Sequence, residues 1–214
     1  MKGSAFSKFI AVLLTAAALC GAYFGVTAYL KAHAYYSLSY AQIEAVLAAN
    51  DYEDETSRVI AESAASLVGK VHYFWGGKSF VKGWDDRWGS LAPVESAGSP
   101  TTGETRPFGL DCSGYITWIF MQTDIENARA LIGEGTYNQW MKSSPIEWSD
   151  IRIGDLVFRN EYPGASSNHV AVCIGFLNGR PVFAHCSSAQ DNVVVTTAGN
   201  VFKYVRRPNL TPAG

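Results

Sequence analysis

The stretch GLDCSGYITWIF, residues 109–120, decides the fold and the chemistry of this chain. Its second half is an apolar run of helical character, and Asp111 precedes it in a setting typical of a helix cap. Cys112 therefore lies at the start of the predicted helix, where the helix dipole favours a thiolate. Cys112 is a buried small hydrophobe, a metal ligand or a nucleophile, and the rest of the sequence has to distinguish these roles.

Two histidines supply the partners that a nucleophilic cysteine needs. His169 opens the run HVAVCIG and His185 lies in PVFAHC, two patterns typical of β-strands. Asn178-Gly179 between them predicts a tight hairpin, so both imidazoles lie at the same end of an antiparallel pair. A thiol needs a base, and the base needs a third group to orient it. We therefore predict Cys112 as nucleophile, His169 as base and His185 as orienting group.

A zinc site is the competing interpretation, because cysteine and histidine are preferred zinc ligands. His169 and Cys173 would stand roughly 13 Å apart along a strand, too far to share an ion with bonds of about 2.0 to 2.3 Å. The sequence also contains no CxxC pair. We expect no metal and no organic cofactor. Cys173 and Cys186 are expected to be buried, and a disulfide among Cys112, Cys173 and Cys186 stays open at this point.

The flanking sequence predicts an α+β domain over residues 56–209, with helices packed on an antiparallel sheet. A helical pattern begins near Val59 and ends at Gly69. Thr136 and Gln139 form a predicted capping box at the start of a further short helix. Short β-branched or aromatic runs then predict an antiparallel meander: DLVF (155–158), HVAVCIG (169–175), RPVFAHC (180–186), NVVVTT (192–197) and VFKYV (201–205).

The beginning of the chain predicts a membrane segment. Lys2 and Lys8 precede an uncharged run over residues 9–30, which as a helix would be roughly 33 Å long and able to span a bilayer core. We expect residues 1–31 to be a transmembrane signal anchor, with a cleaved signal peptide as the alternative because a small-x-small pattern follows. Residues 32–55 are expected to form a stalk with one short helix. Either alternative places the following domain outside the cytoplasm.

Composition excludes some classes of partner. Apolar residues make up 48% of the chain and charged residues 17%, which suits a packed globular core. Lys2 and Lys8 are the only charged residues among the first 30, so the remainder holds 15 basic and 19 acidic side chains. This balance argues against a nucleic-acid partner, which would require a basic face.

A long segment rich in glycine, serine and proline covers residues 78–107. Loops of this length inside a compact domain are uncommon and are often functional. Its first half carries Trp84 and Trp88 around three charged residues, and exposed indoles are costly unless they pack or bind. We expect residues 78–92 to form one wall of a substrate groove, with Trp84 and Trp88 among the substrate-binding residues, and residues 96–105 to be a tolerated insertion.

Five motifs, in this order, resemble those of the NlpC family of bacterial cell-wall cysteine peptidases, within the papain-like superfamily. The resemblance covers about residues 56–209 and implies a reduced papain-like fold, in which N-terminal helices pack on an antiparallel sheet. The segment before DCSG is longer here than is usual in the family. The motifs are YFWGG (73–77), LDCSGYITWIF (110–120), GDLVF (154–158), NHVAVCIG (168–175) and VFAHCSS (182–188).

The resemblance also implies roles for individual residues and a substrate. Cys112, His169 and His185 match the family's nucleophile, base and third polar residue. Tyr73 matches a tyrosine that lines the cleft, and Asp111 and Ser113 match positions implicated in binding the peptide end of the substrate. Members typically hydrolyse the bond between D-γ-glutamate and a diamino acid in peptidoglycan stem peptides. The chain would then act at the bacterial cell membrane with its catalytic domain outside, or be secreted if the N-terminal segment is cleaved.

Two other functions remain open on the sequence. A thioester intermediate can pass its acyl group to any acceptor, so an acyltransferase or a lipid hydrolase could use the same residues. A non-catalytic wall-binding module is the third possibility. It is disfavoured because a pure binding module has no use for a nucleophile accompanied by a base and an orienting group.

Overall fold

The computed structural model describes residues 35–165 and 167–210, together with Gly21 and Tyr23. The chain divides into two units, residues 1–34 and residues 35–214, and every element named below belongs to the second unit. The expected membrane anchor, whose apolar run covers residues 9–30, lies outside the described residues except for Gly21 and Tyr23. Within the described ranges, no helix combines the length and the apolar character that crossing a bilayer requires.

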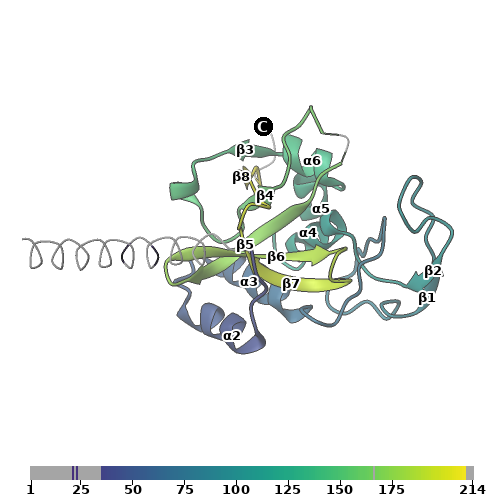
Figure 1. Ribbon diagram of the computed structural model, residues 1–214, viewed down its shortest axis with the longest axis horizontal. Helices are drawn as coiled ribbons and strands as arrows, with labels where there is room; N and C mark the ends of the chain where they lie inside the picture. The colour runs from purple at the N-terminus through teal and green to yellow at the C-terminus, as the bar shows by residue number, and fades with distance from the viewer. Residues whose placement is uncertain (1–20, 22, 24–34, 166, 211–214) are drawn as a thin grey trace, which may run out of the picture. The chain divides into compact units, whose positions relative to one another are not determined.

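An antiparallel sheet with the strand order β3-β8-β4-β5-β6-β7 forms the centre of the second unit (Figure 1). The meander predicted for the first four runs is confirmed, since β4 to β7 follow one another in the sheet. The strands are β3 (Ser143–Pro145), β4 (Leu156–Phe158), β5 (Val170–Leu177), β6 (Arg180–Ser187), β7 (Asn192–Thr197) and β8 (Tyr204–Pro208).

The last strand departs from the predicted meander. It begins at Tyr204, where the sequence predicts a strand over 201–205, and it pairs with β4 and β3 instead of β7. The chain turns after β7 and buries Phe202 in a small apolar cluster on the sheet face opposite the main core. The strand that follows therefore starts beside β4, at the far side of the sheet from β7.

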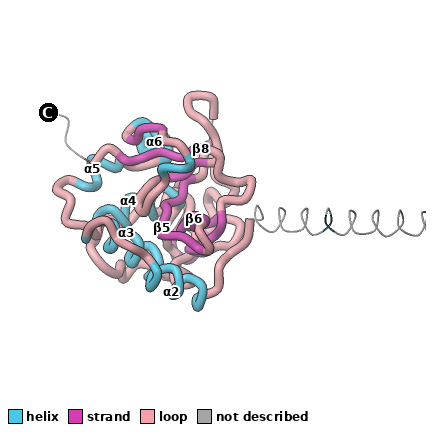
Figure 2. The backbone as a smooth tube through the Cα atoms, turned by 90° about the vertical axis from the view of Figure 1, so that its left-hand side faces the viewer, coloured by secondary structure: helices cyan, strands magenta, loops and turns pink. Residues whose placement is uncertain are grey.

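Three helices, α2 (Tyr40–Ala49), α3 (Glu55–Ser66) and α4 (Cys112–Met121), pack against β5 and β6 (Figure 2). The main core lies between them and the sheet, and alternate residues of each strand point into it, such as Val170, Val172 and Ile174 of β5. The mixed α+β class predicted from the sequence is confirmed. The remaining elements are α5 (Ala128–Ile132), α6 (Thr136–Met141), the 3-10 turn η1 (Trp148–Asp150) and a hairpin of β1 (Leu91–Pro93) and β2 (Thr105–Pro107).

Helix α2 belongs to the core of this unit, whereas the sequence suggested a separate stalk over 32–55. Its Ile43 and Val46 are buried in the main core, and the helix packs on β5. The side-chain amide of Asn50, which ends the helix, donates a hydrogen bond of 2.9 Å to the carbonyl of Ile174. The apolar stripe of a short helix needs a partner surface, and the sheet supplies it.

A β-bulge in β5 places the two predicted site histidines on one face. The register across the two-residue turn would set His185 opposite Val172, on the face away from His169. The bulge at Ile174 shifts the register by one residue, so Val172 pairs with Ala184 instead. Because of this extra residue, His185 points to the same side as His169.

Helix α2 also holds this bulge in place. Gly175 has a φ of 148°, a backbone conformation that L side chains rarely adopt. A Cβ atom at Gly175 would lie 2.3 Å from the Asn50 Oδ1 and 2.6 Å from the Val46 Cγ1. Glycine at this position therefore lets α2 close on the bulge that sets the register of the histidines.

The predicted capping box of Thr136 and Gln139 is absent from α6. Helix α6 begins after Gly135, which has no side-chain cap. The Gln139 side chain instead points into the core and donates 2.8 Å to the carbonyl of Ser113. Gln139 thereby supports the first turn of α4, where the predicted nucleophile lies.

Candidate active site

Close backbone contacts between segments 72–77 and 109–114 build the site. A Cβ atom at Gly114 would lie 2.1 Å from the carbonyl oxygen of Gly77, and one at Gly109 would lie 2.0 Å from that of His72. The two segments also exchange backbone hydrogen bonds on both sides of Leu110. Gly77, Gly109 and Gly114 therefore serve one shared purpose, which is to let the two segments touch.

Asp111 organises the start of α4. Its carboxylate accepts the backbone N–H of Gly114 at 2.6 Å and the Ser113 hydroxyl at 2.7 Å. Lys78 adds an ion pair of 2.5 Å to the other carboxylate oxygen and donates 3.0 Å to the Ser113 hydroxyl. This cap satisfies one free amide of the first turn, that of Gly114, and it fixes Cys112 at the first helical position.

Cys112 lies between α4, β5 and the Tyr73 segment. Its side chain is 6% exposed, and the backbone N–H of Val170, the residue after His169, lies within hydrogen-bonding reach of its sulfur. Tyr73 also reaches Cys112 with its hydroxyl, and burial raises the pKa of that phenol. The Cys112 thiol therefore contacts two donors, the backbone N–H of Val170 and the hydroxyl of Tyr73.

The two histidines form a directly hydrogen-bonded pair. His169 Nε2 lies 3.0 Å from His185 Nδ1, and the rings meet edge to face. Phe202 stacks on the His169 ring with centroids 5.7 Å apart and also contacts His185. Because Nε2 of His169 is engaged, Nδ1 is the nitrogen left to accept a proton.

Burial sets the protonation states of this group of residues. Desolvation raises the pKa of Cys112 to about 12, with a further contribution from the charge of Asp111. Desolvation, together with the positive charge of Arg159, lowers the pKa of His169 to about 4. The pKa of His185 is lowered for the same reasons, with a contribution from His169. Burial therefore favours the neutral thiol and the neutral imidazoles, and it acts against the helix dipole, which favours the thiolate.

Comparison with known proteins assigns the family of this chain. The sequence profile of the NlpC/P60 family matches residues 69–204, well over half of the chain. The chain belongs to the NlpC/P60 family. The match spans the cysteine helix and the strands that carry both histidines. The resemblance read from the five motifs is thereby confirmed, while no curated protein matches the chain in sequence.

Solved structures similar to this NlpC/P60 chain include the peptidoglycan hydrolase RipB from Mycobacterium tuberculosis, with 21% identity, 79% of this chain and 68% of that chain covered, and a TM-score of 0.49. The NlpC/p60 domain of the peptidoglycan hydrolase SagA follows, with 23% identity, coverages of 70% and 97%, and a TM-score of 0.46. RipD from Mycobacterium tuberculosis, described as a non-catalytic NlpC/p60 domain protein adapted to peptidoglycan binding, has 19% identity, coverages of 72% and 98%, and a TM-score of 0.48. All three TM-scores lie below 0.5, so the family assignment rests on the sequence match.

The other cysteines of this NlpC/P60 domain are free thiols. Cys112, Cys173 and Cys186 are buried and form no disulfide, which answers the question that the sequence left open. Cys186 lies close to the Cys112 segment, with its thiol 3.1 Å from the carbonyl oxygen of Leu110. Cys173 lies in the cluster on the other sheet face. Among the described residues, no three His, Cys, Asp or Glu side chains are grouped as a metal site.

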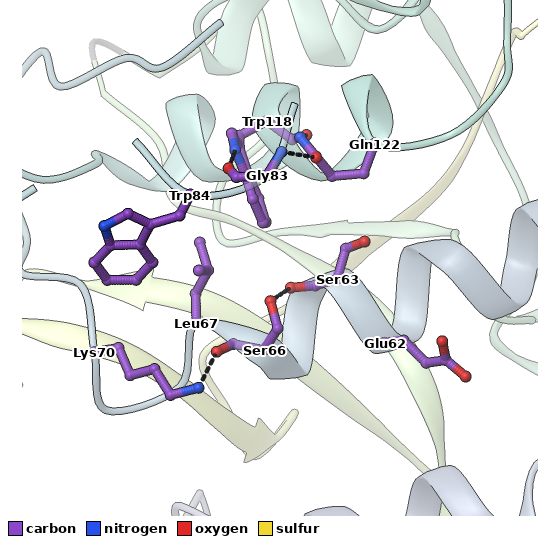
Figure 3. A pocket seen from close by; sticks show the side chains of 9 residues that line it. All are labelled: Glu62, Ser63, Ser66, Leu67, Lys70, Gly83, Trp84, Trp118 and Gln122. Carbon is purple, nitrogen blue, oxygen red and sulfur yellow. Dashed lines mark hydrogen bonds between the residues drawn. The ribbon is translucent and has the colours of Figure 1, made fainter. Parts of the chain in front are cut away.

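The two loop tryptophans lie at the other end of α4 from Cys112. Trp88 is buried and packs edge to face on Trp118, with centroids 5.6 Å apart. Trp84 is 52% exposed and lines a surface pocket of about 490 Å³. Figure 3 shows residues of α3 and the α4 end, Trp118 among them, facing each other across this pocket. Of the three charged residues between the tryptophans, Asp85 is buried and paired with Arg87 at 2.6 Å, and Asp86 is exposed.

Sequence reasoning missed several groups that shape the site. Lys78 follows directly on the WGG motif, and this adjacency was the available signal for its contact with Asp111 and Ser113. Phe202 lies in a run that reads as an ordinary strand, although its ring stacks on His169. His72, which precedes the tyrosine of the YFWGG motif, pairs with Asp191 at 3.0 Å.

Proposed function

We propose that this chain is a cell-wall peptidoglycan endopeptidase that hydrolyses stem peptides at the bond between D-γ-glutamate and a diamino acid. Cys112 is the nucleophile, His169 the base and His185 the group that orients the base. The direct 3.0 Å bond between His169 Nε2 and His185 Nδ1 is the observation that carries this proposal. This bond leaves Nδ1 of His169 free. The backbone N–H of the next residue, Val170, reaches the Cys112 sulfur.

Membership of the family does not by itself imply hydrolysis, since RipD is described as non-catalytic. Two observations support catalysis in this chain: the hydrogen bond between His169 and His185, and the backbone N–H of Val170 that reaches the Cys112 sulfur. A protein that only binds has no need to desolvate two imidazoles, of which His185 is fully buried and His169 partly buried, because desolvation is costly. An acyltransferase or a lipid hydrolase would also form a thioester on Cys112. The transferase differs from the peptidase in the acceptor, and the lipid hydrolase differs in the acyl donor.

The neutral starting state defines the chemistry of the first step. As the Cys112 sulfur attacks the peptide carbonyl carbon, its proton passes to Nδ1 of His169. The Tyr73 hydroxyl and backbone N–H groups at the start of α4 donate to the oxyanion of the tetrahedral intermediate. His169 then gives the proton to the leaving amine, and the C–N bond breaks to leave a thioester on Cys112. Water, deprotonated by His169, hydrolyses this thioester and restores the thiol.

Substrate contacts fall into two regions. Lys78, Asp111 and Ser113 form a charged cluster next to Cys112, which suits the charged peptide end of a stem peptide. At the other end of α4, Trp84 and its pocket suit the ring of a sugar, because indole faces pack on apolar sugar faces while the pocket rim offers hydroxyl, amide and charged groups. Trp88 is buried and packs edge to face on Trp84, so we assign it a supporting role and no contact with the substrate.

The apolar run over residues 9–30 motivates a proposal about location. Lys2 and Lys8 before it favour an N-terminus inside the cell, with the enzyme domain outside. Protease added to intact cells should then degrade residues 35–214 of a membrane-bound protein. Mature protein in the medium that begins at Tyr35 would support the cleaved signal peptide instead.

Digestion of defined muropeptides tests the function. The full-length chain is incubated with purified tripeptide and tetrapeptide muropeptides, and the products are identified by mass spectrometry. A new free amine on the diamino acid, together with a fragment that ends in D-glutamate, is the expected result. Acyl exchange without hydrolysis would point to a transferase, and intact substrate that nevertheless binds would point to a wall-binding module.

A further inference from the structure

The outer nitrogen of His185 meets two hydroxyl groups. His185 Nε2 lies 3.1 Å from the Thr196 Oγ1 and 3.2 Å from the Tyr35 hydroxyl. Thr196, like His185, is fully buried, and Tyr35 is 37% exposed. The Thr196 hydroxyl also lies within hydrogen-bonding reach of the Tyr35 hydroxyl, so the three groups contact one another. The hydrogen-bonded chain that starts at His169 therefore continues through His185 to Thr196 and Tyr35.

A short strap, residues 35–38, delivers Tyr35 to this position. The strap runs antiparallel along β7, with Ser37 opposite Thr196 and a 2.8 Å bond from the Leu38 N–H to the Val195 carbonyl. Gly199 makes room for its first residue, because a Cβ atom there would lie 2.5 Å from the Cβ of Tyr35. The family match begins at residue 69, so the strap lies outside it. The sheet edge thus carries an addition that brings a phenol to the third residue of the site.

Only one arrangement of protons along this series of hydrogen bonds allows His169 to act as the base. Its Nδ1 must be free, so the proton of the neutral ring must be on Nε2, which then donates to His185 Nδ1. His185 must accordingly carry its own proton on Nε2 and donate it outward. In a buried site an N–H without an acceptor is costly, so an acceptor at this point selects the productive tautomer of both rings. The hydroxyl oxygens of Thr196 and Tyr35 are placed to accept.

We propose that Thr196 and Tyr35 are positioning residues that accept the Nε2–H of His185 and so keep Nδ1 of His169 free for the Cys112 proton. Thr196 accepts from His185 and passes its own O–H to the Tyr35 oxygen, and Tyr35 donates to solvent. Neither residue touches the substrate, so both act through the histidines. This inference rests on the proposed catalytic roles of Cys112 and His169, but the tautomers can be observed without any substrate.

Full-length protein labelled with ¹⁵N-histidine and carrying Tyr35→Phe, Thr196→Val or both substitutions provides the test. Long-range ¹H–¹⁵N spectra distinguish imidazoles protonated on Nδ1 from those protonated on Nε2, and the chain has four histidines to assign. The wild type should show Nε2–H on His169 and on His185. The double variant should show a second population with protons on Nδ1, whereas Thr196→Ser should retain the wild-type pattern.

Turnover provides the second measurement. The double variant should lower kcat about 10- to 100-fold with KM changed by less than about twofold, because the change removes orientation and leaves substrate contacts intact. Tyr36→Phe is the matched control in the same strap, since the neighbouring tyrosine is exposed and makes no contact with His185 in the described structure, and it should behave as wild type.

Two results would overturn the inference. One is a double variant whose histidine tautomers equal those of the wild type. The other is a folded double variant whose kcat equals that of the wild type and that of Thr196→Ser. If the wild type cleaves no muropeptide at all, the proposed function fails, and the tautomers of the wild type and its variants then decide the positioning role alone.

Discussion

The two ends of helix α4 differ in accessibility and in chemistry. At the first turn, Cys112 is 6% exposed and is enclosed by Tyr73, the backbone of β5 at Val170 and the Asp111 cap. At the last turn, Trp118 is also buried, but the half-exposed Trp84 and an open pocket of about 490 Å³ lie over it. The helix has ten residues, so the two regions are about 15 Å apart.

This difference suggests a division of labour along one rigid element. Burial at the closed end raises the pKa of the Cys112 thiol and lowers the pKa of the His169 imidazole, which favours the neutral form of both groups. The open end offers aromatic surface and polar groups, and it has no reactive side chain. Substitutions at the first turn should therefore remove turnover, and substitutions at the last turn should alter binding or stability.

Cys112→Ala should produce the largest effect, with a loss of muropeptide hydrolysis of at least about 10⁴-fold, because the attacking sulfur is gone. Its melting temperature should stay close to that of the wild type. Cys173→Ala is the matched control, since this thiol is equally buried but lies in the cluster on the opposite sheet face. The control should keep full activity and lose about 1 kcal/mol of stability. Residual turnover in Cys112→Ala would disprove the assignment of the nucleophile.

The pH dependence tests whether the closed end is as dry as its geometry indicates. The base must be unprotonated, and the pKa of His169 is lowered to about 4, so kcat/KM should keep its value down to about pH 5. An ordinary histidine with a pKa of about 6.5 would leave roughly 3% of the activity at pH 5. Removing the neighbouring positive charge in Arg159→Gln should raise the pKa of His169 and move the acid limb upward.

Stability should depend on pH in the window where activity stays constant. Between about pH 6.5 and pH 4 the unfolded chain binds protons on these histidines while the folded chain does not, so the free energy of unfolding falls as the pH falls. Urea unfolding at several pH values measures this slope. An activity limb near pH 6.5, or a stability that does not depend on pH in this window, would contradict a desolvated pair.

The chemistry of the first turn could be predicted from the sequence, because it depends on local motifs. Asp111 before Cys112 and a hairpin between the two histidine strands are each readable within a few residues. The register is different, because the bulge at Ile174 carries no local signature and is stabilised by α2 from a distant part of the chain. The two histidines were correctly predicted to be neighbours, but that outcome required an extra residue that periodicity does not reveal.

The role of the loop tryptophans could not be derived locally. Trp84 and Trp88 stand four residues apart and look equivalent in the sequence, yet one is buried and the other is half-exposed. The difference arises from Trp118, on which only Trp88 packs. The same holds for Tyr35, whose contact with His185 joins residues 150 positions apart.

Substitutions of Trp84 and Trp88 should affect different quantities, substrate binding for Trp84 and stability for Trp88. Trp88→Ala removes a buried indole and should lower the free energy of unfolding by about 3 kcal/mol. Trp88→Phe should recover most of this loss, because among the described residues the indole N–H of Trp88 has no hydrogen-bond partner to lose. Trp84→Ala should leave stability within about 0.5 kcal/mol and raise the KM for glycan-linked substrates about 5- to 10-fold. Equal KM values for Trp84→Ala and wild type would exclude the pocket from substrate binding.

The smallest effect is expected from the tip of the 78–107 segment. Gly103 and Val94 pair through backbone hydrogen bonds, and Val94 is buried, so the hairpin stem has to stay. Beyond it, the hydroxyl groups of Ser99 and Thr102 bond mainly to each other and to nearby carbonyls. Replacing residues 97–101 with two glycines should therefore change kcat/KM by less than about twofold, because loop shortening alters mainly a small closure entropy.

The tip deletion is also the strictest test of the division along α4. The first and last turns of α4 both lie outside the deleted tip. A deletion that leaves the stem intact therefore disturbs neither the Asp111 cap nor the Trp88 packing. Muropeptide hydrolysis and melting temperature are measured for the deletion beside Trp84→Ala. A tenfold loss of activity at unchanged melting temperature would mean that the tip contacts the ligand. The substrate would then lie across the hairpin, and the pocket beside Trp118 would not be its second point of contact.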